Sequence, residues 1–394
     1  MASPRRVAFS VVAVSAAMFA DSLLYSIIVP VLPVHAESLG ASQSAIGVLF
    51  ASYAVALLAA IPVFGVLSDR IGRRVPLIAG MVGVSVATTL FAFADSYVPL
   101  VAARSVQGLA AAAVWTCGIA LVADIVPATR LGASMGIVMA SMSAGLITGP
   151  PLGGLLAESY GYRAPFVVCA VITAGCALLQ VFVREPPRPA ERSAPLRELF
   201  ANRTIRSTTV AVLVGAGTIS MLEPLLPIDM TERLGAGAAA IGLAFGTAAL
   251  AHLLASPAVG ALADRRGSNG LIPCGLLGMA LVLPFLALPG SALGVTGLLV
   301  GFAIAYSFIL IPALTQIGAV VRDRGGTGYA AAYGLFNMAY ALGMVAGPLL
   351  GSVAVSALSL PVVLTSVGAC LAVGGIVLLR RSGRSAHPLG ALVS

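Results

Sequence analysis

Charged side chains are scarce in this sequence, and lysine is missing altogether. Only 9% of the 394 residues are Asp, Glu, Lys or Arg, and all 22 basic residues are arginine. A phosphate-binding loop of the form GxxxxGK[ST] needs a lysine, so the chain has no such loop through which ATP could drive it. The five cysteines include no CxxC pair, which argues against a disulfide framework or a zinc site. We therefore expect no cofactor and no metal.

The residues that are abundant are apolar, and they occur in long runs. Hydrophobic residues make up 59% of the chain and the mean hydropathy is +1.04, which predicts an all-α protein that crosses a membrane many times. Polar breaks separate twelve runs of helical length. The predicted spans are residues 7–34, 45–67, 76–94, 98–122, 133–156, 165–183, 207–228, 239–263, 271–288, 293–320, 329–355 and 360–379.

The arginines fall mostly on alternate connections between these spans. With the N-terminus inside, all but three lie on the cytoplasmic side; the exceptions are Arg163 and Arg233 outside and Arg104 within a span. Basic residues are retained on the cytoplasmic side of membrane proteins. We therefore expect a multi-pass protein of the inner (plasma) membrane with both termini in the cytoplasm. The net charge of +8 then reflects topology in the lipid bilayer, and we expect no nucleic-acid partner.

Three short motifs of the first half recur in the same order in the second half. The pairs are Pro30/Pro33 with Pro224/Pro227, Asp69-Arg70 with Asp264-Arg265, and Gly149-Pro150 with Gly347-Pro348. The sequence thus predicts a six-helix bundle over residues 1–183, a cytoplasmic linker over 184–206 and a second six-helix bundle over 207–394. Such repeats imply a cavity between the bundles at mid-membrane and alternating access by rocking of one bundle against the other. We expect the protein to act as a monomer.

Two carboxylates lie well inside apolar spans. Asp21 stands in DSLLYSIIVPVLP, and Glu223 precedes the matching prolines in MLEPLLPIDM. A charge near the bilayer centre costs about 2.5–3.5 kcal/mol, so each acid is a functional candidate; for Asp21, the alternative is a role in folding beside a water-filled vestibule. A carboxylate in a cavity of low dielectric constant can hold a proton near neutral pH and release it to an arriving cation. One buried acid can therefore exchange a proton for a cationic amine.

Arg104 is the one arginine inside a predicted span, and it needs a hydrogen-bonding partner there. Two roles remain open for it, a structural clamp on the first span and direct proton gating. Aromatic side chains in the spans could offer ring faces to a cation and apolar packing to a substrate, although each one alone could equally be helix packing. These candidates are Tyr25, Phe50, Tyr53, Trp115, Tyr306, Phe308, Phe336 and Tyr340. His252, alone in the eighth span, is expected to be packing.

The stretch GVLSDRIGRR, residues 65–74, follows the second span. Asp69 and Arg73 are four residues apart and can pair on a helical turn, and Asp124 is a second candidate partner for Arg73. Asp69 could also lie near the N-terminus of the eleventh span, where the helix dipole favours an anion. We expect Gly65 to let two helices approach closely. The residues assigned to a cytoplasmic gate are Gly65, Asp69, Arg70, Gly72, Arg73 and Asp124.

A second glycine-rich stretch, GLITGPPLGG, covers residues 145–154. We expect it to form a close contact between the two bundles and to bend the fifth span. It adds Gly145, Gly149, Pro150 and Gly153 to the residues that govern conformational change.

The motif at residues 65–74 resembles the signature between the second and third spans of the major facilitator superfamily. ARSVQG, which contains Arg104 and Gln107, is similar to that family's fourth-span motif, and GLITGPPLGG to the fifth-span motif of its drug/proton antiporters. A closer resemblance is to the vesicular monoamine and acetylcholine transporters and their bacterial relatives, on DSLLYSIIVP and MLEPLLPI. It implies the major facilitator fold and proton-coupled antiport or multidrug efflux of cationic, amine-containing hydrophobic compounds. It also implies that Asp21 binds the amine and that Glu223 takes part in proton coupling.

The chain departs from that resemblance at three places. Tyr53 stands where the vesicular transporters carry a lysine, the tenth span has no acid, and Asn337 replaces an acid of the eleventh. Asn337 joins the predicted substrate site, but the number of coupled protons stays open. A proton symporter or facilitator for a small metabolite is the alternative function. An intramembrane enzyme is less favoured, because GASMG at 132–136 fits GxSxG but lacks the strand that a nucleophile elbow requires; we expect no enzymatic activity.

Overall fold

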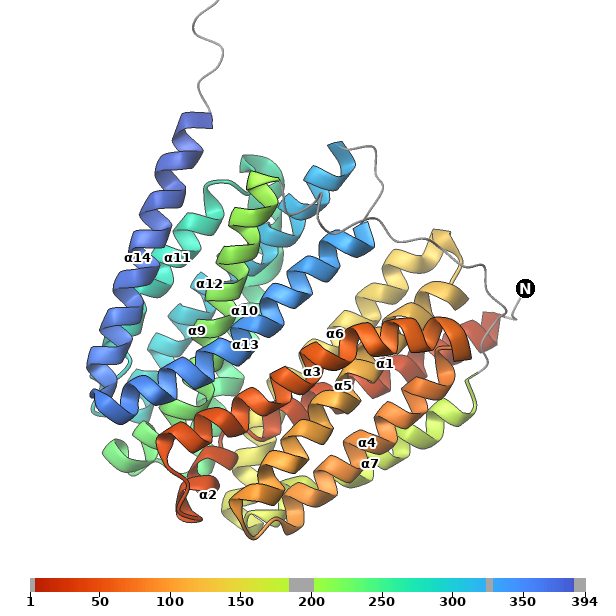
Figure 1. The fold of residues 1–394 in the computed structure, drawn as a ribbon, viewed down its shortest axis with the longest axis horizontal. Helices are drawn as coiled ribbons and strands as arrows, with labels where there is room; N and C mark the ends of the chain where they lie inside the picture. The colour runs from red at the N-terminus through yellow and green to blue at the C-terminus, as the bar shows by residue number, and fades with distance from the viewer. Residues whose placement is uncertain (1–3, 184–201, 324–328, 386–394) are drawn as a thin grey trace, which may run out of the picture. The chain divides into compact units, whose positions relative to one another are not determined.

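A computed structural model describes residues 4–183, 202–323 and 329–385 of the chain, and these residues are almost entirely helical (Figure 1). Residues 184–201 of the predicted linker lie outside the described ranges. The elements are α1 (Pro4–Ile27), α2 (Leu32–Ser38), α3 (Gln43–Ile71), α4 (Arg74–Phe93), α5 (Tyr97–Ile125), α6 (Ala128–Tyr160), α7 (Arg163–Val181), α9 (Arg203–Leu234), α10 (Ala238–Arg266), α11 (Leu271–Val282), a 3-10 turn η1 (Leu283–Phe285), α12 (Ala292–Asp323), α13 (Tyr329–Ala357) and α14 (Leu360–Ser385).

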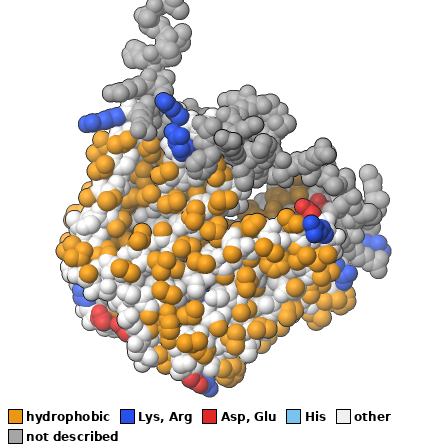
Figure 2. Space-filling view, in the orientation of Figure 1, with side chains coloured by type: hydrophobic (Ala, Val, Ile, Leu, Met, Phe, Trp, Pro, Cys, Tyr) orange, Lys and Arg blue, Asp and Glu red, His pale blue; other side chains and the backbone are white. Residues whose placement is uncertain are grey.

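The prediction of a polytopic helical protein is confirmed. Within the described residues, eleven helices are long and apolar enough to cross a membrane, and Leu271–Phe285 is a shorter apolar helix at the place of the predicted ninth span. Large apolar side chains are exposed on these helices, for example Leu254 at 70% and Leu293 at 81%. In Figure 2 apolar side chains cover most of the visible face, while the few charged ones lie near its edges. Such a surface is suited to lipid rather than to water.

The first predicted span is interrupted, which corrects the single run expected over residues 7–34. Helix α1 ends at Ile27 and α2 begins at Leu32. Pro30 and Pro33 have no N–H to donate and disfavour helical geometry in the residue before them, so the helix stops there. The corresponding Pro224 and Pro227 lie inside the continuous helix α9. The proline pattern therefore repeats in the sequence but not in the secondary structure.

The described residues form two compact units. The first contains α1–α7 together with Glu223–Gly246 and Pro348–Val353, and the second contains the remaining described helices. The C-terminal end of α9 and the start of α10 thus belong to the first unit. Part of the reason is a helix cap: the carboxylate of Glu158 on α6 accepts a hydrogen bond of 2.9 Å from the backbone N–H of Ala239 in the first turn of α10, where the helix dipole favours an anion.

Helix α1 is the core of the first unit. It contacts α5, α6 and α7, and side chains along its length, including Val14, Met18 and Leu24, have no exposed surface. In the second unit α11 packs against α12 and α14. Small residues bring helices together in both units. A Cβ added at Gly108 of α5 would collide with the backbone of Tyr53 on α3, and one at Gly347 of α13 with the backbone of Gly217 on α9.

Candidate functional site

Asp21 lies in the buried middle of the first unit. Its side chain is 1% exposed, and the indole Nε1–H of Trp115 on α5 donates a hydrogen bond of 2.6 Å to its Oδ2. The other oxygen, Oδ1, is buried and has no hydrogen-bond partner among the described residues. Burying an oxygen without a partner costs free energy unless something binds it. One oxygen of Asp21 is therefore fixed in place, and the other is available to a proton or a cation.

Glu223 is joined to α1 one helical turn beyond Asp21. The hydroxyl of Tyr25 donates to both carboxylate oxygens of Glu223, at 3.0 Å each. The ring of Tyr25 also meets the ring of Tyr53 on α3, with centroids 5.1 Å apart. The structure thus brings together the predicted site residues of the first unit, which come from α1, α3, α5 and α9.

Arg104 lies beside the same aromatic side chains and is 1% exposed. Its Nη1 donates a hydrogen bond of 2.9 Å to Oε1 of Gln107, and no carboxylate forms a salt bridge with it among the residues that the structure describes. Sequence reasoning named Gln107 only as part of a motif and missed this bond. The spacing of three residues on one helix was the signal that could have found it.

The other predicted substrate residues belong to the second unit. Phe308 is on α12, and Phe336, Asn337 and Tyr340 are on α13. Phe336 is buried, Asn337 is exposed, and the other two are half-buried. Their part in a substrate site stays a prediction.

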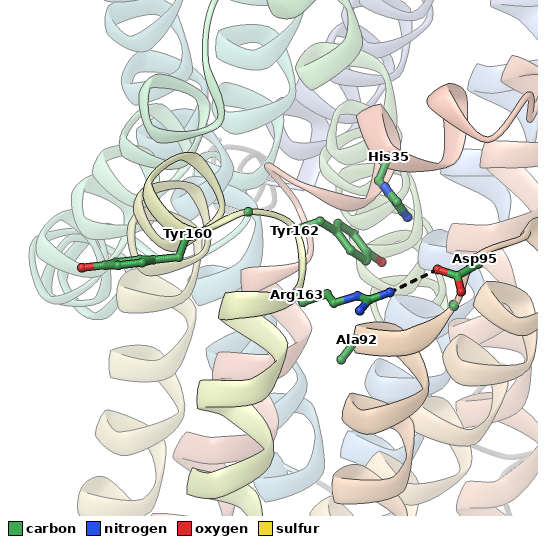
Figure 3. A pocket seen from close by; sticks show the side chains of 8 residues that line it. His35, Ala92, Asp95, Tyr160, Tyr162 and Arg163 are labelled. Carbon is green, nitrogen blue, oxygen red and sulfur yellow. Dashed lines mark ion pairs between the residues drawn. The ribbon is translucent and has the colours of Figure 1, made fainter.

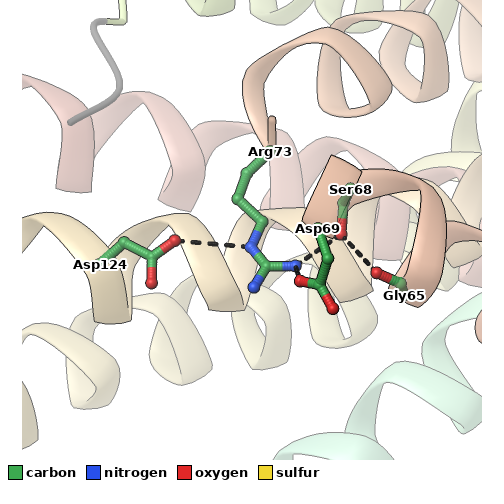
Figure 4. A network of polar contacts seen from close by, with 5 residues as sticks. All are labelled: Gly65, Ser68, Asp69, Arg73 and Asp124. Carbon is green, nitrogen blue, oxygen red and sulfur yellow. Dashed lines mark hydrogen bonds and ion pairs between the residues drawn. The ribbon is translucent and has the colours of Figure 1, made fainter. Parts of the chain in front are cut away.

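The gate motif forms the local pairs that its spacing predicted (Figure 4). Nη1 of Arg73 lies 2.6 Å from Oδ1 of Asp69, and its Nε lies 3.4 Å from Oδ2 of Asp124. Arg73 also donates to the hydroxyl of the fully buried Ser68 at 2.6 Å, a partner that the sequence analysis missed. Gly72 ends α3 with φ of 101°, a backbone conformation that favours glycine. One arginine therefore ties the end of α3 to the end of α5.

Gly65, Arg70 and the second neighbour expected for Asp69 complete the description of this motif. A Cβ at Gly65 would meet nothing within 4 Å among the described residues, so the close helix approach expected at Gly65 stays a prediction. The carbonyl oxygen of Gly65 accepts a hydrogen bond of 3.0 Å from Ser68. Arg70 is exposed. The start of the eleventh span, the alternative neighbour proposed for Asp69, lies outside the described residues.

The fifth-span glycines do not simply join the two bundles, which corrects the prediction. A Cβ at Gly145, Gly149 or Gly153 would collide with α1, and at Gly149 it would strike the Ser26 hydroxyl. Their spacing of four residues places them on one face of α6, and that face packs against the first helix of the same bundle.

The adjacent face of α6 makes the contact that was expected with the second half of the chain. A Cβ at Gly154 would collide with the backbone of Ala238, and one at Gly242 of α10 would collide with the backbone of Pro150. Residues of α10 up to Gly246 belong to the first unit. The motif thus holds α6 between α1 and the start of α10.

A separate polar cluster lies where α2 meets the connections before α5 and α7 (Figure 3). A cavity of about 360 Å³ is lined there by residues that include His35, Asp95, Tyr162 and Arg163. The ring of His35 stacks on Tyr162 with centroids 3.5 Å apart, and Arg163 lies 3.6 Å from Asp95. Burial lowers the pKa of His35, opposed by a backbone hydrogen bond with Ala94 and by the charge of Asp95. Sequence reasoning missed this cluster because its members lie far apart in the chain, on α2, before α5 and at the start of α7.

Two polar residues lie away from these clusters, His252 on α10 and Ser134 on α6. In the second unit, Nδ1 of His252 lies 2.8 Å from the hydroxyl of the buried Ser307, so this histidine has a specific polar partner. Ser134 of the GASMG motif lies inside α6, whereas a nucleophile elbow is a turn between a strand and a helix.

Comparison with known proteins gives consistent matches. The model of the Major Facilitator Superfamily matches residues 14–216 and 208–392. The synaptic vesicular amine transporter of Rattus norvegicus is 32% identical over 333 residues, which are 82% of this chain and 64% of that protein. The chain therefore spans slightly less than two-thirds of that relative. A probable vesicular acetylcholine transporter-B of Danio rerio is 31% identical over 86% of this chain and 72% of that protein.

Other matches extend over more of the partner's length. An uncharacterised transporter of the same superfamily from Schizosaccharomyces pombe is 29% identical over 88% of this chain and 89% of that protein. Among solved structures, the inward-facing, unoccupied form of a bacterial homologue of the human lysosomal transporter Spinster has a TM-score of 0.78 and 16% identity. The alignment covers 97% of this chain and 96% of that one. At this identity the likeness shows the fold alone, and it confirms the fold class predicted from the sequence.

Proposed function

Because the chain belongs to the major facilitator superfamily, and is a multi-pass membrane protein, we propose that it is a proton-coupled antiporter. It exports small cationic, amine-containing hydrophobic compounds by alternating access, in the manner of a multidrug or monoamine transporter. The named relatives support the substrate class, since one is a vesicular amine transporter and another a probable vesicular acetylcholine transporter.

The observation that carries this proposal is the state of Asp21. Its buried carboxylate is held on one oxygen by Trp115, while the other oxygen has no partner among the described residues. A proton on that free oxygen neutralises the group, and an ammonium near it favours the ionised form. The two cations therefore exclude each other at one site, and mutual exclusion at a site with alternating access is what antiport requires.

Glu223 and the gate complete the proposed mechanism. Glu223, whose carboxylate accepts hydrogen bonds from Tyr25, contributes a second carboxylate to the site, while Asp21 exchanges the proton. The Arg73 network stabilises one conformation and is released in the other, so substrate and proton bias the same two-state change. We place the protein in the plasma membrane with both termini and the gate on the cytoplasmic side, on the strength of the arginine distribution.

The test is uptake into proteoliposomes with an acidic lumen. The probe is a quaternary aromatic ammonium, because its permanent charge prevents the passive trapping that weak-base amines show in acidic vesicles. Antiport predicts that the probe accumulates as protons leave, that a protonophore abolishes accumulation, and that protein-free vesicles take up none. Accumulation of the probe that requires an alkaline lumen would indicate a symporter. A probe flux that the protonophore does not change would indicate a facilitator. Either result would overturn the proposal.

A further inference from the structure

The guanidinium group of Arg104 lies among three aromatic rings. Its central carbon is 4.9 Å from the ring centroid of Phe50, 4.9 Å from that of Tyr53 and 5.6 Å from that of Tyr25. The rings come from two helices, α1 and α3, and the arginine from a third, α5. All three distances lie within the range at which a ring face attracts a cation. We call Tyr25, Phe50 and Tyr53 the aromatic cage.

Among the described residues no carboxylate forms an ion pair with this cation, although the charge of Glu223 acts on it from nearby. The one hydrogen bond that Arg104 donates goes to the neutral amide of Gln107, and its buried Nε has no hydrogen-bond partner among the described residues. When a buried guanidinium has an N–H without a hydrogen-bond partner, its hydrogen bonds offset only part of the free-energy cost of removing it from water. The nearby Glu223 is instead bound on both oxygens by the Tyr25 hydroxyl. Arg104 is therefore a buried cation that lies against three ring faces and forms no ion pair within the described part of the chain.

Ring faces beside a carboxylate are the groups that recognise an organic ammonium ion. In this structure the protein's own side chain occupies those faces. We propose that Arg104 is a tethered occupant of the substrate's cation subsite, so that an incoming ammonium competes with the guanidinium for the aromatic cage. The inference rests on the proposed transport of amines, and it assigns the cage, whose Tyr25 lies one helical turn from Asp21 on α1, as the ring faces that the cationic head of the substrate contacts.

Selectivity follows from this competition. Without substrate, the cage is filled by the positively charged guanidinium of Arg104 rather than by water. A cationic substrate must therefore displace Arg104 to reach the cage. A neutral analogue of the same shape has no charge for the ring faces to attract, so it does not displace the guanidinium. Removing the arginine should therefore tighten the binding of cations and leave the binding of neutral analogues unchanged.

The first test is occupancy of the emptied cage. In the purified full chain, Arg104→Ala should be stabilised against thermal unfolding by methylguanidinium, whereas the wild type, whose cage is filled, should not respond. The double variant Phe50→Leu/Arg104→Ala removes one ring and should lose most of that stabilisation. Equal stabilisation of the wild type and Arg104→Ala, or undiminished stabilisation of the double variant, would show that methylguanidinium binds elsewhere and would overturn the inference.

The second test measures competition directly. Arg104→Gln removes the charge, and it should bind a quaternary aromatic ammonium about tenfold more tightly than the wild type does. The affinity for the neutral carbon isostere of that probe should be the same in both proteins. Equal or weaker ammonium binding by folded Arg104→Gln would refute competition, and this variant decides the matter if Arg104→Ala does not fold.

The two tests separate this inference from the proposed function. If methylguanidinium binds in the emptied cage but the wild type transports no ammonium in vesicles, the cage is a cation-binding site and the transport proposal is wrong. If ammonium antiport is present but removing Arg104 does not tighten binding, antiport stands and the role of Arg104 as a competitor is wrong.

Discussion

Asp21 is a buried acid in which one carboxylate oxygen, Oδ1, has no hydrogen-bond partner among the described residues. Replacing the residue with asparagine retains the shape and leaves an oxygen that can accept the Trp115 N–H, but the amide can neither pair with a cation nor exchange a proton. We predict that Asp21→Asn nearly abolishes quaternary ammonium uptake driven by a pH gradient, while thermal unfolding in detergent stays close to that of the wild type.

The matched control is Asp229→Asn, because Asp229 pairs with Arg233 on the same helix at 2.7 Å near the end of α9. This variant should transport almost normally, since pairs of this kind contribute little. If Asp21→Asn transported at the wild-type rate, Asp21 would not belong to the site.

His35 gives the fold a dependence on pH that is separate from transport. Burial lowers its pKa, so the unfolded chain binds a proton more readily than the folded one does below about pH 6.5, the ordinary histidine value. Its contribution to stability is therefore present at neutral pH and is lost as the pH falls through the folded pKa. We predict that the unfolding temperature of the full chain falls less steeply between pH 7.5 and pH 5 in His35→Asn than in the wild type.

Glu37, two residues away, supplies a control of opposite sign. Burial, and then the charge of Glu232, raise the pKa of Glu37, so its proton stabilises the fold at low pH and this contribution is lost as the pH rises. Glu37→Gln should therefore make the loss of stability on acidification steeper. A pH profile that His35→Asn leaves unchanged would contradict the role assigned to His35.

At the scale of elements, the ends of α3 and α5 are joined through one arginine with two acidic partners. Asp69→Asn removes the closer partner, at 2.6 Å, and leaves Asp124 at 3.4 Å. This weakens the conformation in which the two helix ends are tied, and does not touch the residues of the candidate substrate site. We predict a transport rate that falls several-fold with little change in the Kd for the ammonium probe.

Asp264→Asn is the comparison for this variant, because Asp264-Arg265 repeats the Asp69-Arg70 pair in the second half. Binding in equilibrium and transport at saturating probe would be measured on both variants. A collapse in affinity with normal turnover for Asp69→Asn would assign Asp69 to the substrate site instead of to the gate.

The sequence predicted those features of the fold that depend on residues close together in the chain. The apolar runs placed the helices, and the spacing of Asp69 and Arg73 predicted their pair, because four residues form one helical turn. The sequence could not show that Pro30 ends a helix while Pro224 lies within one. A proline leaves the same unmet carbonyl in both places, and only the neighbouring structure decides whether it is tolerated.

In the candidate site, too, the sequence predicted single residues but not the contacts between residues that are far apart in the chain. Tyr25 and Glu223 were each predicted, but their hydrogen bond joins residues 198 positions apart, and no local rule relates their positions. The partner of the fifth-span glycines was likewise open, since a small-residue face shows that something packs closely and not which helix does so. Family resemblance supplied roles for single residues, whereas the aromatic cage around Arg104 required coordinates.

For the whole molecule, the arginine distribution makes a prediction about orientation. Arginines are retained on the cytoplasmic side during insertion, and the central connection and the C-terminal end are both rich in them. Reporter fusions at Pro189 and after Arg384 should both read as cytoplasmic. An external signal at either position would reverse the assigned orientation or change the number of crossings, and the gate at Arg73 would then lie on the other side.

The net charge moved in one transport cycle depends on which buried carboxylates exchange a proton. Among the described residues, Asp21 and Glu223 are the two carboxylates that lie well inside the spans. Both oxygens of Glu223 accept from Tyr25, whereas Asp21 keeps one oxygen without a partner. We therefore assign the exchanged proton to Asp21 and a constant protonation state to Glu223.

One monovalent ammonium then exchanges for one proton, and no net charge crosses the membrane. A membrane potential should drive almost no accumulation, although it is worth about 2.3 kcal/mol per charge per 100 mV where charge does move. Proteoliposomes given either a potassium diffusion potential or a pH gradient test this, with uptake of the quaternary ammonium as the readout. We expect uptake with the pH gradient alone and none with the potential alone. Strong accumulation driven by potential, lost in Glu223→Gln, would instead mean that Glu223 carries a second proton through the cycle.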